Sequence, residues 1–60
     1  MYVFQMYFDA DDGEPVPAIK HEVSPNYSEA WAHKFAQSVF RRYADRQRPY
    51  RGWFFRRIDQ

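Results

Sequence analysis

The stretch YVFQMYF, residues 2–8, decides the fold of this 60-residue chain. Side chains alternate along it between two faces, and this period of two indicates a half-buried strand. The face expected to meet the core carries Tyr2, Phe4, Met6 and Phe8. The other face carries Val3, Gln5 and Tyr7. We therefore predict a strand over about residues 2–9, around which the rest of the fold is arranged.

Four further segments follow this strand. Residues 9–17 are rich in Asp and Pro, which is turn chemistry, and residues 18–23 can return as a second strand. Residues 26–47 repeat apolar side chains at intervals of three and four, which predicts a helix, and Pro49 stops it. Residues 50–58 alternate again and are predicted to form a third strand. This order predicts a small α+β domain of ββαβ type, a three-stranded antiparallel sheet in the order 2-1-3 with one helix on one face.

The predicted helix has two candidate starts. Asn26 can cap it, with Glu29 three residues on to complete a capping-box-like exchange, and Ser24 followed by Pro25 is the rival. The apolar positions are expected to form one broad stripe against the sheet, made of Trp31, Ala32, Phe35, Ala36, Val39, Phe40 and Tyr43. The opposite side is expected to carry Lys34, Gln37, Arg41, Asp45 and Arg48.

Size and composition allow one domain with a thin core, spanning residues 1–60. A domain this small buries only about 60% of the surface that its unfolded chain exposes. The chain has no Cys, so disulfides are excluded, and aromatic residues, 22% of the chain, have to supply the packing. No apolar run reaches the roughly 20 residues of a membrane span, and the N-terminus lacks a basic segment followed by an apolar one. We expect a soluble cytoplasmic protein.

Charge is sorted along the chain. Residues 1–33 carry six acids and one Lys, a net charge of −5, whereas residues 34–57 carry eight bases and one acid, a net charge of +7. With Asp59 these give the total of +1. Such an asymmetry favours a partner of opposite charge, either a polyanion or an acidic protein surface, without identifying it.

The sheet is expected to have one open face, because a single helix covers only one side. That face is predicted to carry Val3, Tyr7, Trp53 and Phe55, flanked by Arg51 and Arg57. An exposed apolar patch of this kind usually marks an interface with a nucleic acid, a protein or a second copy of the chain. The alternative is a shift of one residue in the third strand, which turns Trp53 and Phe55 toward the helix and Phe54 and Tyr50 outward.

The basic and aromatic run RRYADRQRPYRGWFFRR, residues 41–57, has components that single-stranded nucleic acids need, guanidiniums for phosphates and rings for stacking. The same residue types serve protein interfaces, and the Arg residues also suit the solvated side of a helix. The residues expected to bind a partner are Tyr7, Arg41, Arg42, Arg46, Arg48, Arg51, Trp53, Phe55 and Arg57.

Catalytic and metal-binding patterns are absent from the sequence. The acidic loop DADDGE, residues 9–14, fails the EF-hand pattern, because Gly13 falls one position too early. His21 and His33 stand at no recognisable metal-ligand spacing, and no Ser lies in a nucleophile elbow. We expect no cofactor, no metal and no enzymatic activity.

Two functional hypotheses remain. Near-zero net charge favours a small protein-binding regulator or inhibitor that acts by occluding a partner's surface over a dedicated nucleic-acid binder. Small proteins without cysteine or catalytic apparatus are also typical of phage and mobile-element accessory proteins, including anti-CRISPR and other anti-defence inhibitors. A nucleic-acid-binding module that uses residues 41–57 is the alternative, and a homodimer through the open sheet face is a third arrangement.

Overall fold

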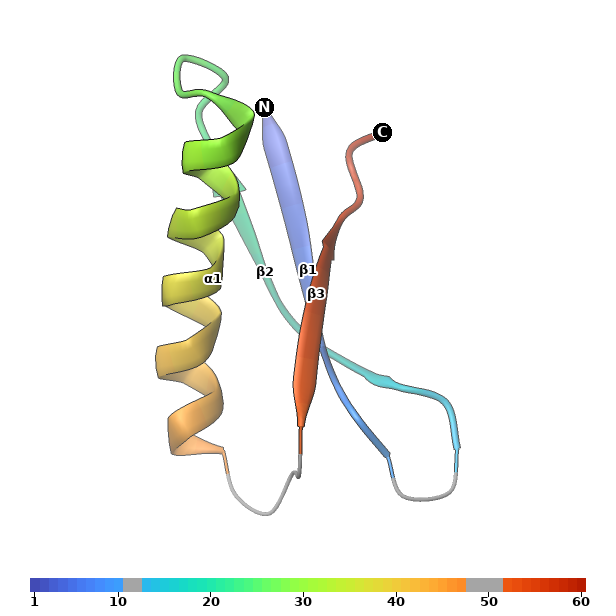
Figure 1. The fold of residues 1–60 in the computed structure, drawn as a ribbon. Coiled ribbons are helices and arrows are strands. Elements are labelled where there is room, and N and C mark those ends of the chain that lie inside the picture. Colours follow the sequence, from blue (N-terminus) through green and yellow to red (C-terminus); the bar gives the residue numbers. More distant parts are fainter. Residues whose placement is uncertain (11–12, 48–51) are drawn as a thin grey trace.

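A computed structural model describes residues 1–10, 13–47 and 52–60 of the chain. The elements are, in order, β1 (Tyr2–Phe8), β2 (Val16–Val23), α1 (Glu29–Arg46) and β3 (Trp53–Arg57). The strands form one antiparallel sheet in the order β2-β1-β3, and α1 lies along one face of it (Figure 1). The predicted α+β architecture, with the 2-1-3 strand order and a single helix packed on the sheet, is confirmed.

The element boundaries differ from the prediction at the strand ends and at the start of the helix. β2 begins at Val16, so Pro17 lies inside the strand, which is tolerated because β2 is an edge strand. The helix is capped by Ser28, whose Oγ accepts a hydrogen bond from the Trp31 N–H at 3.1 Å. Asn26 instead belongs to the preceding turn, where its N–H donates to Ser24 Oγ at 3.2 Å. Neither predicted cap was the right one.

The pairing of β1 with β2 contains one register shift. Gln5 pairs with Lys20 and Tyr7 with Pro17, so β2 has an extra residue in this interval and Met6 has no register partner there. A bulge of this kind leaves backbone groups without ladder partners. The buried Gln5 side chain supplies a hydrogen-bond donor beside this irregularity. Its Nε2 donates to the carbonyls of Met6 at 2.9 Å and Ile19 at 3.2 Å.

The core lies between the sheet and the helix. Its buried members are Phe4, Met6, Phe8, Val23, Ala32, Ala36 and Phe40. The two alanines let the helix approach the central strand, and Phe40 fills the space one turn further on. Trp31 and Phe35 were predicted to join this stripe, but both are exposed. Each directly precedes a buried alanine, and one residue turns the helix by about 100°, which carries their rings out of the interface.

The faces of β3 are the reverse of the main prediction. Met6 is fully buried on the helix side and pairs with Phe55, and directly opposed residues share a face. Phe55 therefore packs against α1, with its ring centroid 5.2 Å from that of Phe40, and Trp53 lies on the same side. Phe54 turns outward, as the alternative register predicted. The alternative also predicted that Tyr50 turns outward, but Tyr50 lies outside the described residues.

Within the part of the chain that the structure describes, no helix combines the length and the apolar character needed to cross a membrane.

Candidate functional site: an aromatic ladder on the helix

Three rings stack along the outside of α1 and its entrance. Tyr27, Trp31 and Phe35 are spaced four residues apart, and they remain 50%, 43% and 42% exposed. The ring centroids of Tyr27 and Trp31 are 4.2 Å apart with planes at 20°, and those of Trp31 and Phe35 are 5.1 Å apart at 10°. We call these three residues the aromatic ladder. It is an ordered array of large apolar side chains held in solvent.

Local structure fixes both ends of the ladder. At its upper end, the Tyr2 hydroxyl donates to the Tyr27 carbonyl at 3.0 Å, which ties the turn before α1 to the central strand. At its lower end, Phe35 lies 5.3 Å from the His21 ring of β2. The His21 ring also touches the buried Phe40, and among the described residues its Nε2 has no hydrogen-bond partner. The ladder is therefore anchored on the β2 side of the helix.

Stacking determines which part of each ring is presented to solvent. Trp31 has Tyr27 one turn before it and Phe35 one turn after it, so both faces of the indole are covered by neighbouring rings. What remains accessible of the indole is its edge. Because the rings already hold one another in place, little side-chain freedom is left to lose when a partner binds.

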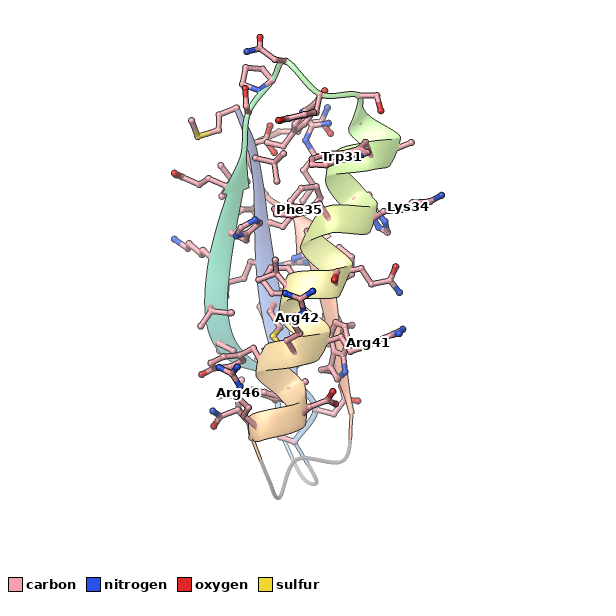
Figure 2. The ribbon with its side chains drawn as sticks, turned by 90° about the vertical axis from the view of Figure 1, so that its left-hand side faces the viewer. Trp31, Lys34, Phe35, Arg41, Arg42 and Arg46 are labelled. Atoms are coloured by element: carbon pink, nitrogen blue, oxygen red, sulfur yellow. The ribbon has the colours of Figure 1, made fainter. Side chains whose placement is uncertain are left out.

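Cations continue the line of the ladder toward the end of the helix. Figure 2 shows Trp31, Phe35, Arg42 and Arg46 one after another down α1, with Lys34 and Arg41 directed to the other side. All four basic residues are exposed. Lys34 and Arg41, with Gln37 and Ser38, line a shallow groove of about 210 Å³. On the outer face of α1, the aromatic ladder thus continues into Arg42 and Arg46, and Lys34 and Arg41 lie beside this line.

The open face of the sheet carries a smaller cluster. Tyr7 and Phe54 stack with centroids 5.1 Å apart, and the Arg56 guanidinium lies 5.1 Å from the Tyr7 ring centroid. Arg56 Nε also donates to the Tyr7 hydroxyl at 3.2 Å. These three side chains, with Glu14, Pro15 and Pro17, line a groove of about 450 Å³. Of the residues predicted for this face, Tyr7 lies there, and so does Val3, which is on the same face of β1.

Arg57 was predicted to flank the open face, but it lies on the helix side, opposite Phe4. Its Nε and Nη2 donate to the two carboxylate oxygens of Asp59, and its Nη1 donates to Glu29 at 3.0 Å. The guanidinium also lies 4.7 Å from the Tyr2 ring centroid. We call this group the C-terminal clasp. The hydrogen bond to Asp59 is the main cause of the raised pKa of Arg57.

Asp59 completes the clasp by accepting a hydrogen bond from the Val3 N–H at 3.0 Å. The hydrogen bonds from Arg57 and then from Val3 hold the pKa of the Asp59 carboxyl well below its usual range. Arg57 therefore holds together segments of its own chain, and its side chain is only 21% exposed.

The nine residues predicted to bind a partner do not form one surface. Arg41, Arg42 and Arg46 lie on the outer face of α1, Tyr7 lies on the open sheet face, and the helix-side residues are Trp53, Phe55 and Arg57. The predictions for Arg48 and Arg51 lie outside the described residues. Sequence reasoning missed the aromatic ladder, although the spacing of 27, 31 and 35 is the signal that could have found it.

Over residues 1–10, 13–47 and 52–60, no three His, Asp or Glu side chains come close enough together to hold a metal ion. Comparison with known proteins finds no matching family model, no similar curated protein and no similar solved structure.

Proposed function

We propose that this protein is a non-enzymatic binding module that lays the outer face of α1 against another protein and so occludes that protein's surface. The observation that carries the proposal is the aromatic ladder, with Trp31 and Phe35 both more than two-fifths exposed. Trp, Tyr and Arg are the residue types that dominate the energetics of protein interfaces, and an amphipathic helix with anchors one turn apart fits an apolar groove.

The stacking geometry favours a protein over a single-stranded nucleic acid. Bases stack on exposed ring faces, but both faces of Trp31 are already covered by Tyr27 and Phe35. Ring edges, by contrast, insert readily into an apolar groove, where edge-to-face contacts are favourable. The partner surface should therefore be a groove that accepts the three ladder rings along one helix, with the indole of Trp31 entering edge-on.

The basic residues on the outer face of α1 determine which charge the partner surface should carry. Arg42 and Arg46 continue the ladder, so carboxylates at the corresponding end of the partner groove would meet them. Complementary charge of this kind raises the association rate and fixes orientation more than it adds affinity. Within this class, an anti-defence inhibitor such as an anti-CRISPR protein, acting in the cytoplasm of a host cell, is the specific role that the small size favours.

The test compares ladder variants with a control of similar exposure on another surface. Trp31→Ala and Phe35→Ala remove ladder rings, whereas Val16→Ala changes a 40% exposed side chain on β2. A partner captured by the wild type is identified by mass spectrometry, purified and titrated against all three variants. Each ladder variant should bind at least about 30-fold more weakly, and Val16→Ala should bind like the wild type. Circular dichroism verifies that each variant is folded. Equal binding by every variant would contradict the proposal.

Nucleic-acid binding is the second candidate, favoured by the four cations on the outer face of α1. Labelled single-stranded and duplex oligonucleotides are titrated by fluorescence anisotropy at about 50 and 200 mM salt. Binding that falls steeply with salt and is abolished by combining Arg41→Glu with Arg42→Glu would put this function first. Absence of binding at the lower salt concentration leaves the protein-binding proposal in place.

A further inference from the structure

The two edges of the sheet differ in how they are protected. Edge strands expose unpaired backbone groups, and proteins guard them with proline, bulges and charged side chains. β2 has all three, since it contains Pro17, the register shift and the charged residues Lys20 and Glu22. β3, with the sequence WFFRR, has neither proline nor a register shift. The β3 edge is therefore the one that can pair with a further strand.

The backbone groups at this edge can be assigned from the pairing with β1. Asp9 N–H donates to the Gly52 carbonyl at 3.0 Å, and Ile58 N–H donates to the Val3 carbonyl at 2.8 Å. Antiparallel strands alternate between residues that bond the neighbour and residues that point away from it. The N–H and C=O groups of Trp53, Phe55 and Arg57 therefore point outward, and no hydrogen bond among the described residues uses them.

We propose that β3 pairs antiparallel with β3 of a second copy of this chain, on a twofold axis that passes between the two Phe55 residues. This register brings all the outward backbone groups together and forms about six hydrogen bonds across the interface. The result is a six-stranded sheet in the order β2-β1-β3-β3-β1-β2 with both helices on the same face. This contact goes beyond the proposed function, which uses a different surface.

The side chains select this register. Centred on Phe55, the pairing sets Trp53 opposite Arg57 of the second copy and Phe54 opposite Arg56 of the second copy. Every Arg therefore lies opposite a ring and not opposite another cation, at about 4.5–5.5 Å between Cβ atoms. Moving the axis to Arg56 would place two guanidiniums directly opposite each other, which is destabilising. Moving it to Phe54 would leave Arg57 without a partner within β3.

The arginines do not act as guards of this edge, because each is held over a ring of its own chain. Arg56 lies over Tyr7 and Arg57 over Tyr2, so their charges are drawn toward β1. Pairing would also bury more of Trp53 and Phe55, which are half-buried on the helix side. Apolar area at the contact thus adds to the backbone hydrogen bonds.

The assembly closes at two chains. Its remaining edges are the two β2 strands, which carry the proline, the register shift and the charges that oppose further pairing. The aromatic ladder stays accessible, since it is anchored next to His21 on the β2 side of each helix. A dimer would present two ladders on one face, which raises avidity for a partner with repeated sites.

Sedimentation equilibrium over a range from about micromolar to about millimolar chain concentration tests the proposal. The wild type should shift toward twice the mass of one chain as its concentration rises. Phe54→Arg sets like charges opposite each other twice by symmetry and should weaken the dimer by about tenfold or more. Val16→Arg adds the same charge on the β2 edge at the same 40% exposure, and it should leave the dimer unchanged. Mixing Phe54→Arg with Arg56→Glu should restore association, because the two new charges then face each other.

Amide exchange followed by NMR supplies a readout at single residues. The N–H of Phe55, which points outward, should become protected as the concentration rises, while the N–H of Phe54, already bonded to β1, should not change. A wild type that stays monomeric over the whole range overturns the proposal. A dimer that Phe54→Arg leaves intact, or that Val16→Arg weakens equally, overturns it as well, since either result places the contact elsewhere.

Discussion

Arg57 holds the Asp59 carboxylate with two parallel hydrogen bonds, Nε to Oδ1 at 2.7 Å and Nη2 to Oδ2 at 2.8 Å. Paired contacts of this geometry are stronger and more directional than single hydrogen bonds between neutral groups. Because Asp59 also accepts from Val3, the pair attaches the segment after β3 to the start of the central strand. The clasp therefore contributes to fold stability in a way that depends on the charge of Asp59.

Acid should remove that contribution. The pKa of Asp59 is lowered in the folded chain, so its stabilising effect is present above the unfolded value of about 3.9 and is lost as the pH falls below it. Asp59→Asn should lower the melting temperature at neutral pH, and the difference from the wild type should shrink below about pH 4. Thermal unfolding at a series of pH values measures this. Asp45→Asn on the exposed helix face is the control, and an equal shrinkage there would contradict the role of the clasp.

Ser28→Ala should destabilise the fold by about 1 kcal/mol, because the Trp31 N–H then loses its capping acceptor. Urea unfolding followed by circular dichroism gives the free energy of unfolding. Ser38→Ala, in the middle of the same helix, replaces an exposed serine by a better helix former and should be neutral or slightly stabilising. Equal losses in both variants would mean that Ser28 acts through something other than the cap.

Phe40→Ala and Phe35→Ala should differ in stability, because Phe40 belongs to the core and Phe35 to the ladder. Phe40 is fully buried, so its removal should cost about 3–5 kcal/mol, enough to unfold most of a 60-residue domain. Phe35 is exposed on the ladder, so its removal should change stability by no more than about 1 kcal/mol. Thermal unfolding distinguishes the two. Unfolding by Phe35→Ala would assign the ladder to the core.

Gln5→Leu should cost about 1–3 kcal/mol, since the carbonyls of Met6 and Ile19 would lose their donor beside the register shift. Backbone amide exchange should also show faster opening of the middle of β2. Gln37→Leu makes the same chemical change at an exposed helix position and should have little effect on stability. A neutral Gln5→Leu would show that the bulge does not need the amide.

The sequence was sufficient to predict the order of the elements and the strand topology, because period, turn chemistry and short connections all agree. The sequence could not show which face of β3 meets the helix, because rings occupy both faces. The pairing of Met6 with Phe55 decides this. The predicted helix stripe was also too wide. Trp31 and Phe35 fit the periodicity, but the buried residues of α1 lie on the narrower line through Ala32, Ala36 and Phe40.

Both termini lie at the end of the molecule where α1 begins, whereas β1 ends and β2 begins at the far end (Figure 1). The Tyr2 hydroxyl bonded to the Tyr27 carbonyl brings the first strand directly to the ladder at that same end. Anything fused to either terminus therefore emerges at the end of the molecule where the ladder begins and can shield it from a large partner. Gly13, where an added Cβ would meet open space, is the better place for a fluorophore or an affinity handle. An interaction screen that tags a terminus could miss the very surface it is meant to find.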